Sequence, residues 1–90
     1  MANQTNTNPR RYDTAGVAIC VDPTKILEMV WVNPTADGDD LVLTNIASGD
    51  TLIERKGKAG TDQFVLNVPT VFHQLYLTTI DGGVLEVTVE

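Results

Sequence analysis

Three carboxylates lie close together in the run Asp37-Gly38-Asp39-Asp40, the arrangement in this chain that comes nearest to a metal site. A calcium loop of the EF-hand kind needs oxygen ligands through about twelve positions and a closing bidentate glutamate. Here the apolar residues Leu41 and Val42 follow Asp40 directly. Because aspartate also favours turns by accepting hydrogen bonds from its own backbone, we expect a solvated turn without a bound metal.

The chain has a single histidine, His73, and a single cysteine, Cys20. One Cys and one His cannot build a zinc cage, and a lone Cys excludes an internal disulfide. His73 could act as a general base, but no nucleophile motif accompanies it, so we expect a partly buried histidine bonded to backbone. Cys20 falls in an apolar segment, where a thiol behaves as a small hydrophobe. Residues 57–61 resemble a phosphate-binding loop in composition only. These residues indicate neither an enzyme nor a cofactor site.

Short strands are the elements that would have to position any site. Turn residues recur roughly every 8–12 positions, which favours a single antiparallel β-sandwich or small barrel of about seven strands. No stretch shows sustained helical spacing. We expect strands at Ala15–Val21, Thr24–Asn33, Leu41–Ile46, Thr51–Lys56, Gln63–Val68, Gln74–Thr79 and Val84–Val89.

Turn residues and alternation also predict the connections and the core. Ser48-Gly49 and Asp81-Gly82 each predict a hairpin between the strands that flank them, and Pro69–His73 predicts a bend. Strand 24–33 is apolar on both faces, so it is either covered twice or presents one face to another chain. The expected core consists of Val17, Ile19, Ile26, Val30, Val32, Leu43, Leu52, Phe64, Leu66, Leu75, Leu77, Leu85 and Val87.

The first 14 residues differ from the rest of the chain. They are rich in Asn and Thr and contain one aromatic residue, Tyr12. Such a segment cannot bury enough apolar area to offset its ordering entropy. We therefore expect a flexible N-terminal arm over residues 1–14 and one β domain over residues 15–90. The arm is either a frayed end without a role or a segment that orders on a partner, with Arg10, Arg11 and Tyr12 as its anchors.

Charge is divided unevenly between these two parts. Residues 1–12 carry two arginines and no acid, whereas the remainder carries four basic residues against all twelve acids, a formal net charge of −8. A body of that charge repels phosphate backbones, so we expect no nucleic-acid partner. No apolar run approaches the roughly 20 residues that span a bilayer, and the N-terminus lacks the apolar region of a signal peptide. We expect a soluble chain made in the cytoplasm, with no membrane partner.

The small size of the chain and its apolar surface residues lead us to expect that it assembles with other chains. A core this small supplies on the order of 3–5 kcal/mol without a staple, and a partner that binds only the folded state adds stability by mass action. Trp31 and Tyr76 would extend an outward apolar row if they faced solvent, although a second sheet could equally cover Trp31. We therefore expect a homo-oligomer, a dimer or a trimer, with Trp31 and Tyr76 as further partner-binding residues.

Two stretches resemble a known group of proteins. Ile26–Asn45, which contains Val30-Trp31-Val32-Asn33-Pro34-Thr35-Ala36-Asp37-Gly38-Asp39-Asp40, and Leu75–Leu85 are similar to small β proteins encoded among tailed-phage and prophage structural genes. The resemblance covers less than half of the β domain. It implies a virion component on the outer capsid surface, a decoration or cement protein that bridges major capsid subunits. It transfers no catalytic residue.

Other functions stay open at this point. The same resemblance is compatible with a phage fibre or a head–tail accessory protein, which would bind another virion protein. A small carbohydrate- or ligand-binding β-sandwich is a further alternative, and it would need exposed aromatic and polar groups that converge on one site.

Overall fold

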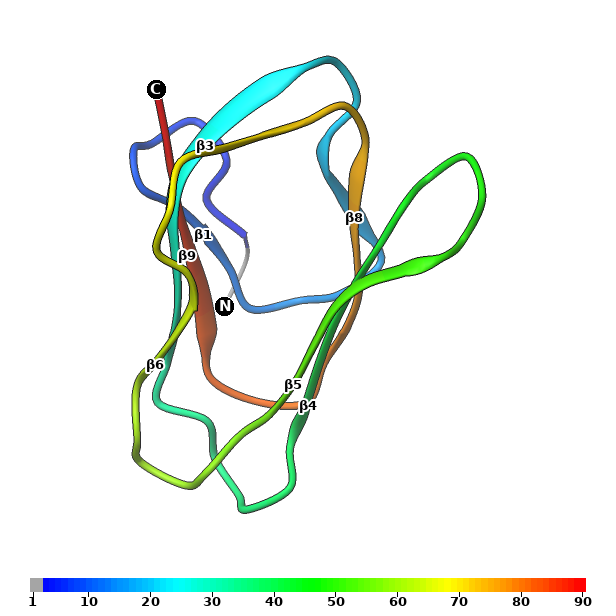
Figure 1. The fold of residues 1–90 in the computed structure, drawn as a ribbon. Coiled ribbons are helices and arrows are strands. Elements are labelled where there is room, and N and C mark those ends of the chain that lie inside the picture. The colour runs from blue at the N-terminus through cyan, green and yellow to red at the C-terminus, as the bar shows by residue number, and fades with distance from the viewer. Residues whose placement is uncertain (1–2) are drawn as a thin grey trace.

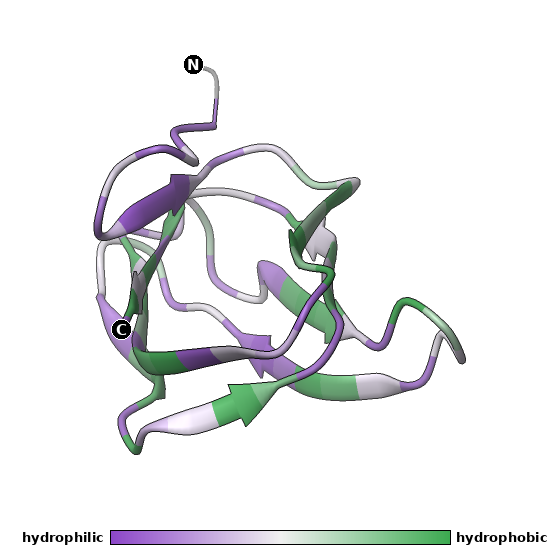
Figure 2. Ribbon diagram, turned by 90° about the horizontal axis from the view of Figure 1, so that it is seen from above, coloured by the Kyte–Doolittle hydropathy of each residue, from purple (hydrophilic) through white to green (hydrophobic). Residues whose placement is uncertain are grey.

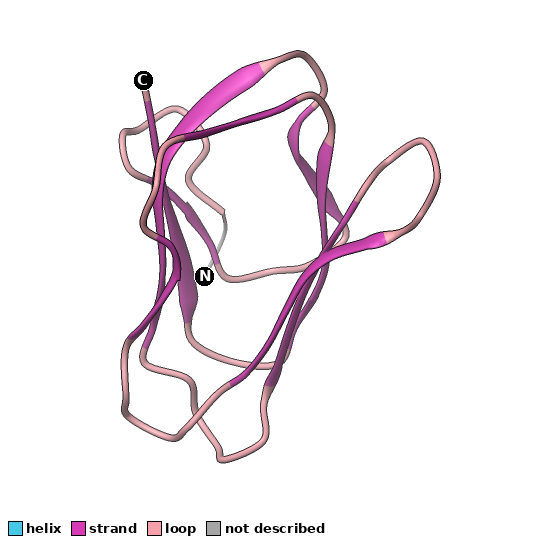
Figure 3. Ribbon diagram, viewed as in Figure 1, coloured by secondary structure: helices cyan, strands magenta, loops and turns pink. Residues whose placement is uncertain are grey.

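The computed structural model describes residues 3–90, which form two antiparallel sheets without a helix (Figures 1 and 3). The first sheet has the order β1 (Arg10–Tyr12), β9 (Val84–Val89), β3 (Thr24–Val32) and β6 (Gln63–Leu66), and β7 (Thr70–Phe72) also pairs with β3. The second sheet has the order β2 (Val17–Cys20), β8 (Leu75–Ile80), β4 (Asp40–Thr44) and β5 (Thr51–Lys56). The sheets do not close into a barrel, so the expected all-β sandwich is confirmed.

The core lies between the two sheets, and the apolar residues that form it are spread over strands of both (Figure 2). Seven of the expected core residues are buried there: Ile19, Ile26, Leu43, Leu75, Leu77, Leu85 and Val87. Val17 and Leu66 pack against this core while partly exposed. The core also contains residues that alternation did not predict as core: Tyr12, Cys20, Met29, Trp31, Leu41 and Val65.

A β-bulge in β3 explains why Met29 and Trp31 are buried. Ile26 pairs with Val89 and Glu28 pairs with Thr88, so Leu27 has no partner in this register. An extra residue on one strand shifts the side chains that follow it to the other face. Ile26 therefore shares the inner face with Met29 and Trp31, and the expectation that Val30 and Val32 join Ile26 in the core is wrong.

A second β-bulge changes which side chains of β6 face the core. Met29 pairs with Leu66 and Val30 pairs with Phe64, which leaves Val65 as the extra residue. Val65 is buried, whereas Phe64 lies on the outer face beside Val30 with 60% of its surface exposed. The expectation of a core Phe64 is therefore wrong.

Leu52 is the fourth expected core residue that lies outside the core, after Val30, Val32 and Phe64. It is the extra residue between the pairs Leu43–Ile53 and Thr44–Thr51, and 45% of its surface is exposed. The hairpin that contains it, β4–β5, forms as expected.

The hairpin expected at Asp81-Gly82 does not form, because β8 and β9 lie in different sheets. The connection crosses between the sheets and is tied to both. Trp31 of β3 donates from Nε1 to Gly82 O at 2.8 Å, and Asp81 accepts at Oδ2 from the Asp40 N–H at 2.9 Å. Gly83 has a φ of +73°, which glycine adopts without strain. A turn of this composition therefore serves a crossover as well as it serves a hairpin.

The N-terminal segment is not the flexible arm that we expected. Residues Arg10–Tyr12 form β1, which pairs with Val87, Glu86 and Leu85 of β9, and Tyr12 is buried. Asn8 Nδ2 donates to Val89 O at 3.0 Å and Asn8 Oδ1 accepts from the Val89 N–H at 3.1 Å, so an earlier residue is also held to β9. The described part of the segment is ordered because one aromatic side chain reaches the core and the backbone completes a sheet. The division at residue 14 is therefore wrong.

Arginine side chains bridge the two open sides of the sandwich. Arg10 Nη1 donates to Ile19 O at 3.1 Å, which links β1 to β2, and Arg55 Nη2 donates to Val65 O at 3.4 Å, which links β5 to β6. On the β5–β6 side Gln63 Nε2 also donates to Lys56 O at 2.9 Å. A planar guanidinium reaches a carbonyl across a gap too wide for a strand ladder. Arg10 thus has a structural role within the chain.

Residues 3–90 contain no helix that is long and apolar enough to cross a membrane.

Candidate binding surfaces

The carboxylates of the Asp37–Asp40 turn bond mainly to the chain itself. Asp39 Oδ2 accepts from the Thr35 N–H at 3.0 Å, the Thr35 hydroxyl at 3.0 Å and the Ala36 N–H at 3.1 Å. Asp37 Oδ1 accepts from the Ala59 N–H at 3.0 Å, and Asp40 forms an ion pair with Lys56. Among residues 3–90, no group of three or more His, Cys, Asp or Glu side chains is arranged to hold a metal ion. The turn is built by hydrogen bonds of the kind that aspartate side chains favour.

These contacts predict the response of the turn to calcium. We expect millimolar calcium to leave the melting temperature unchanged, and Asp39→Ala to lower stability by about 1–3 kcal/mol whether or not calcium is present. Differential scanning fluorimetry with calcium or with a chelator measures both effects. A melting temperature that rises by several degrees with calcium, and does so only while Asp39 is present, would instead establish a metal site.

Cys20 and His73 do not form a reactive pair. The Cys20 thiol is buried and donates to Phe72 O at 3.6 Å, and burial raises its pKa above the ordinary value. A raised pKa lowers the thiolate fraction at neutral pH and so disfavours a nucleophilic role. His73 is exposed to solvent, so the expected partly buried histidine is wrong. The thiol packs as a small hydrophobe, as expected.

Of the five residues expected to bind a partner, Tyr76 borders one surface pocket and Arg10 borders another. Trp31 and Tyr12 are buried in the core, and burial is the main cause that raises the pKa of Tyr12. Arg10 bridges β1 to β2, and Arg11 Nε pairs with Glu86 Oε2 at 3.0 Å. Four of these side chains are therefore bound mainly within the chain. Trp31 and Tyr12 suggested a binding surface because they are aromatic, but they pack in the core.

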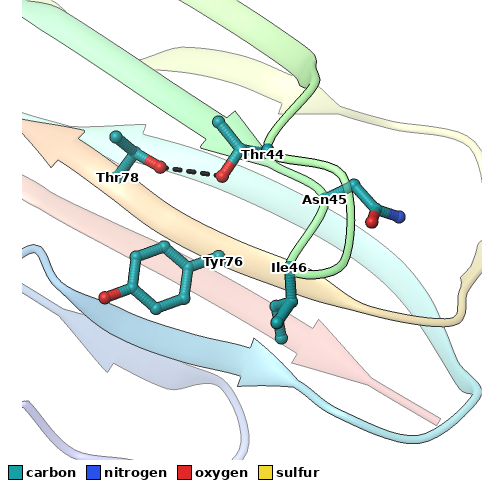
Figure 4. A pocket seen from close by; sticks show the side chains of 6 residues that line it. Thr44, Asn45, Ile46, Tyr76 and Thr78 are labelled. Atoms are coloured by element: carbon teal, nitrogen blue, oxygen red, sulfur yellow. Dashed lines mark hydrogen bonds between the residues drawn. The ribbon is translucent and has the colours of Figure 1, made fainter.

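Tyr76 borders a pocket of about 370 Å³ on the outer face of the second sheet (Figure 4). Thr44 ends β4, Tyr76 and Thr78 lie on β8, and the β4–β5 loop supplies the rest of the wall. The Thr44 and Thr78 hydroxyls bond to each other at 2.8 Å. In Figure 4, Ile46 and the Tyr76 ring lie side by side below this bond, and the Asn45 amide points away from them. The pocket is lined by Thr44, Asn45, Ile46, Gly49, Tyr76 and Thr78, and none of these is charged.

The β4–β5 loop that closes the pocket is preorganised. Asn45 Oδ1 accepts from the N–H groups of Ala47 and Ser48 at 2.9 and 3.1 Å, and the Gly49 N–H donates to Asn45 O at 2.8 Å. Gly49 has a φ of +73°, which its lack of a Cβ permits. The loop projects from the body in Figure 1 and carries Ile46 at 39% exposure. Asn45 before a turn was a sequence feature that could have indicated this loop.

The β6–β7 edge of the first sheet carries a second apolar area. β6 and β7 both pair with β3, on the side opposite β9, so they follow one another along this edge. Phe64, Val68 and Val71 are 60%, 63% and 51% exposed there. Phe64 lies opposite Val30 and Val71 opposite Lys25, and cross-strand partners share one face of a sheet. The Tyr76 pocket and this apolar edge thus lie on different sheets.

Comparisons of the chain with protein-family models, with curated proteins and with solved structures found no match.

Proposed function

We propose that this chain is a non-enzymatic structural protein of a phage particle, which decorates the outer capsid surface and bridges major capsid subunits. The observation that carries the proposal is the row of exposed apolar side chains Phe64, Val68 and Val71 along the β6–β7 edge. Exposed apolar groups gathered at one place mark interaction sites more often than single ones do. The resemblance of Ile26–Asn45 and Leu75–Leu85 to phage structural proteins supports the same role.

The β6–β7 edge is the proposed capsid contact. Phe64 is the aromatic anchor of the row, and aromatic residues dominate the energetics of protein interfaces. Lys25, which lies opposite Val71, pairs with Glu90 at 3.5 Å, so it adds little net charge beside the row. The occupant that fits is an apolar patch on a major capsid subunit with a polar rim.

The net charge of the chain fits a position on the outside of a particle. The formal net charge is −6, and several aspartates lie in exposed turns, among them Asp37, Asp62 and Asp81. Like-charged surfaces repel one another and keep large particles soluble. Reinforcement of a shell needs no catalysis, since a protein that binds only the assembled lattice stabilises it by linkage.

Binding to empty shells of the major capsid protein encoded in the same genome tests this function. We expect Phe64→Asp and Val71→Asp each to weaken cosedimentation with the shells by about tenfold or more, because each buries a charge in an apolar contact. Leu52→Asp is the matched control, since Leu52 is an exposed apolar residue of the second sheet. Wild-type protein that stays in the supernatant at micromolar shell concentration would overturn the proposed function.

A further inference from the structure

The outer face of the second sheet is uncharged across its centre. Ala18 pairs with Tyr76, and Tyr76 pairs with Thr44, so these three side chains form one outward row across β2, β8 and β4. Val42 pairs with Thr79 in a second row, and Thr78 bonds to Thr44. Charges begin at the β5 margin, with Glu54 opposite Val42 and the Asp40–Lys56 ion pair, and at Asp50 at the end of the β4–β5 loop.

The outer face of the first sheet is different. Arg11 pairs with Glu86, and Lys25 pairs with Glu90, so ion pairs lie across β1, β9 and β3. Glu28 is exposed on the same sheet. Interface centres are depleted in charged residues and enriched in aromatic ones such as tyrosine. The second sheet therefore has the composition of an interface centre, whereas the outer face of the first sheet carries two ion pairs and an exposed glutamate.

A projecting side chain and a hollow lie next to each other on this uncharged face. Ile46 stands on the preorganised β4–β5 loop, and the pocket beside Tyr76 opens next to it (Figure 4). The polar groups of the pocket are largely used, because the Thr44 and Thr78 hydroxyls bond each other and Asn45 Oδ1 bonds the loop backbone. A hydrocarbon side chain fits such a hollow better than a sugar or another polar ligand, which would leave its own groups unpaired.

We propose that a second copy of this chain binds to this face, as a two-fold dimer in which Ile46 of each copy enters the Tyr76 pocket of the other. A two-fold interface uses one patch twice, so it needs a projection and a matching hollow on the same surface. Two chains with a net charge of −6 repel each other, and the uncharged face lets them approach with the least repulsion. A different protein could bind the hollow without a projection beside it. The presence of both on one surface therefore favours a second copy of this chain.

A dimer would have two binding sites for the capsid, one on each copy of the chain. The interface lies on the second sheet and the β6–β7 edge belongs to the first, so a dimer presents two capsid-binding edges. Two linked sites raise avidity by effective concentration, without any further contact. Only this consequence rests on the proposed function, because the dimer itself can be tested without shells.

Sedimentation equilibrium of the full chain across a micromolar to millimolar concentration range tests the dimer. We expect a mass of twice the 9.8 kDa monomer at high concentration. Ile46→Asp should raise the dissociation constant by about 100-fold, since it places a charge at the centre of an apolar contact. Thr78→Arg, on β8, should also raise the dissociation constant by about 100-fold. Ile46 and Thr78 are both exposed, so we expect both variants to keep the far-UV circular dichroism spectrum of the native fold.

Phe64→Asp is the matched control, because it adds the same charge to an exposed apolar position of the other sheet. We expect it to leave the dissociation constant within about twofold. A monomeric wild type at millimolar concentration overturns the dimer, and so does dissociation by Phe64→Asp with Ile46→Asp unaffected. A dimer that fails to bind shells refutes the virion role alone. Shell binding by a strict monomer refutes the dimer alone.

Discussion

Replacing Trp31 with alanine should lower the free energy of unfolding by about 3–5 kcal/mol. Trp31 is the largest fully buried side chain of residues 3–90, and its Nε1–H donates to Gly82 O at 2.8 Å. The substitution leaves a cavity between the sheets and removes the donor from that carbonyl. Chains of this size are stable by only a few kcal/mol, so we expect the variant to be largely unfolded at 25 °C.

Urea unfolding followed by far-UV circular dichroism measures this loss, because Trp31 is the only tryptophan and its removal deletes the fluorescence probe. Trp31→Phe keeps a ring in the core and loses the bond to Gly82, so we expect a smaller loss of about 1–3 kcal/mol. Phe64→Ala is the control on the outer face, with an expected loss within about 0.5 kcal/mol. Equal losses for Trp31→Ala and Phe64→Ala would contradict the inner face described for β3.

Removing residues 1–12 should unfold the chain. The deletion removes β1 from the edge of β9 and takes Tyr12 out of the core, where it lies opposite Leu85. Truncating a buried aromatic side chain costs about 3–5 kcal/mol by itself, and the deletion also exposes the N–H and C=O groups of β9 that paired with β1. A test of shell binding with this truncated chain would therefore report loss of folding.

Point variants within β1 separate the core contact from the surface contact. We expect Tyr12→Ala to lower the free energy of unfolding by about 3–5 kcal/mol. Arg11→Ala should cost no more than about 1 kcal/mol, since its ion pair with Glu86 is partly exposed. Chemical unfolding of both variants provides the comparison. A truncated chain with native circular dichroism and an unchanged midpoint would show that the segment is dispensable for the fold.

Part of the site could be predicted from particular residues. Ser48-Gly49 between two apolar runs predicted the β4–β5 hairpin, and in the structure Asn45 and Gly49 hold the loop that connects its strands. Tyr76 was correctly placed on an outer face, because Leu75 and Leu77 on either side of it are buried. The pocket itself could not be predicted, since it depends on how the loop lies over β8.

Tyr12 and Trp31 show the limit of reasoning from composition. Both are aromatic residues that suit a binding surface as well as a core, and their sequence context does not distinguish the two. Tyr12 is buried because β9 offers an unpaired edge to Arg10–Tyr12, and β9 is more than 70 residues away along the chain. Contacts of that sequence separation leave no trace in a local pattern.

The sequence by itself determined the class of fold: strands without helices, the approximate extents of all described strands except β1 and β7, the β4–β5 hairpin and seven of the core residues. These follow from local alternation and turn chemistry, which act over a few residues. The tertiary structure alone decided three other features: the inner face after each bulge, the sheet to which β9 belongs and the burial of Tyr12. A bulge shifts a strand by one residue only in relation to its partner, and sheet membership is set by pairing between distant segments. Both are therefore decided when the two sheets pack on a common core.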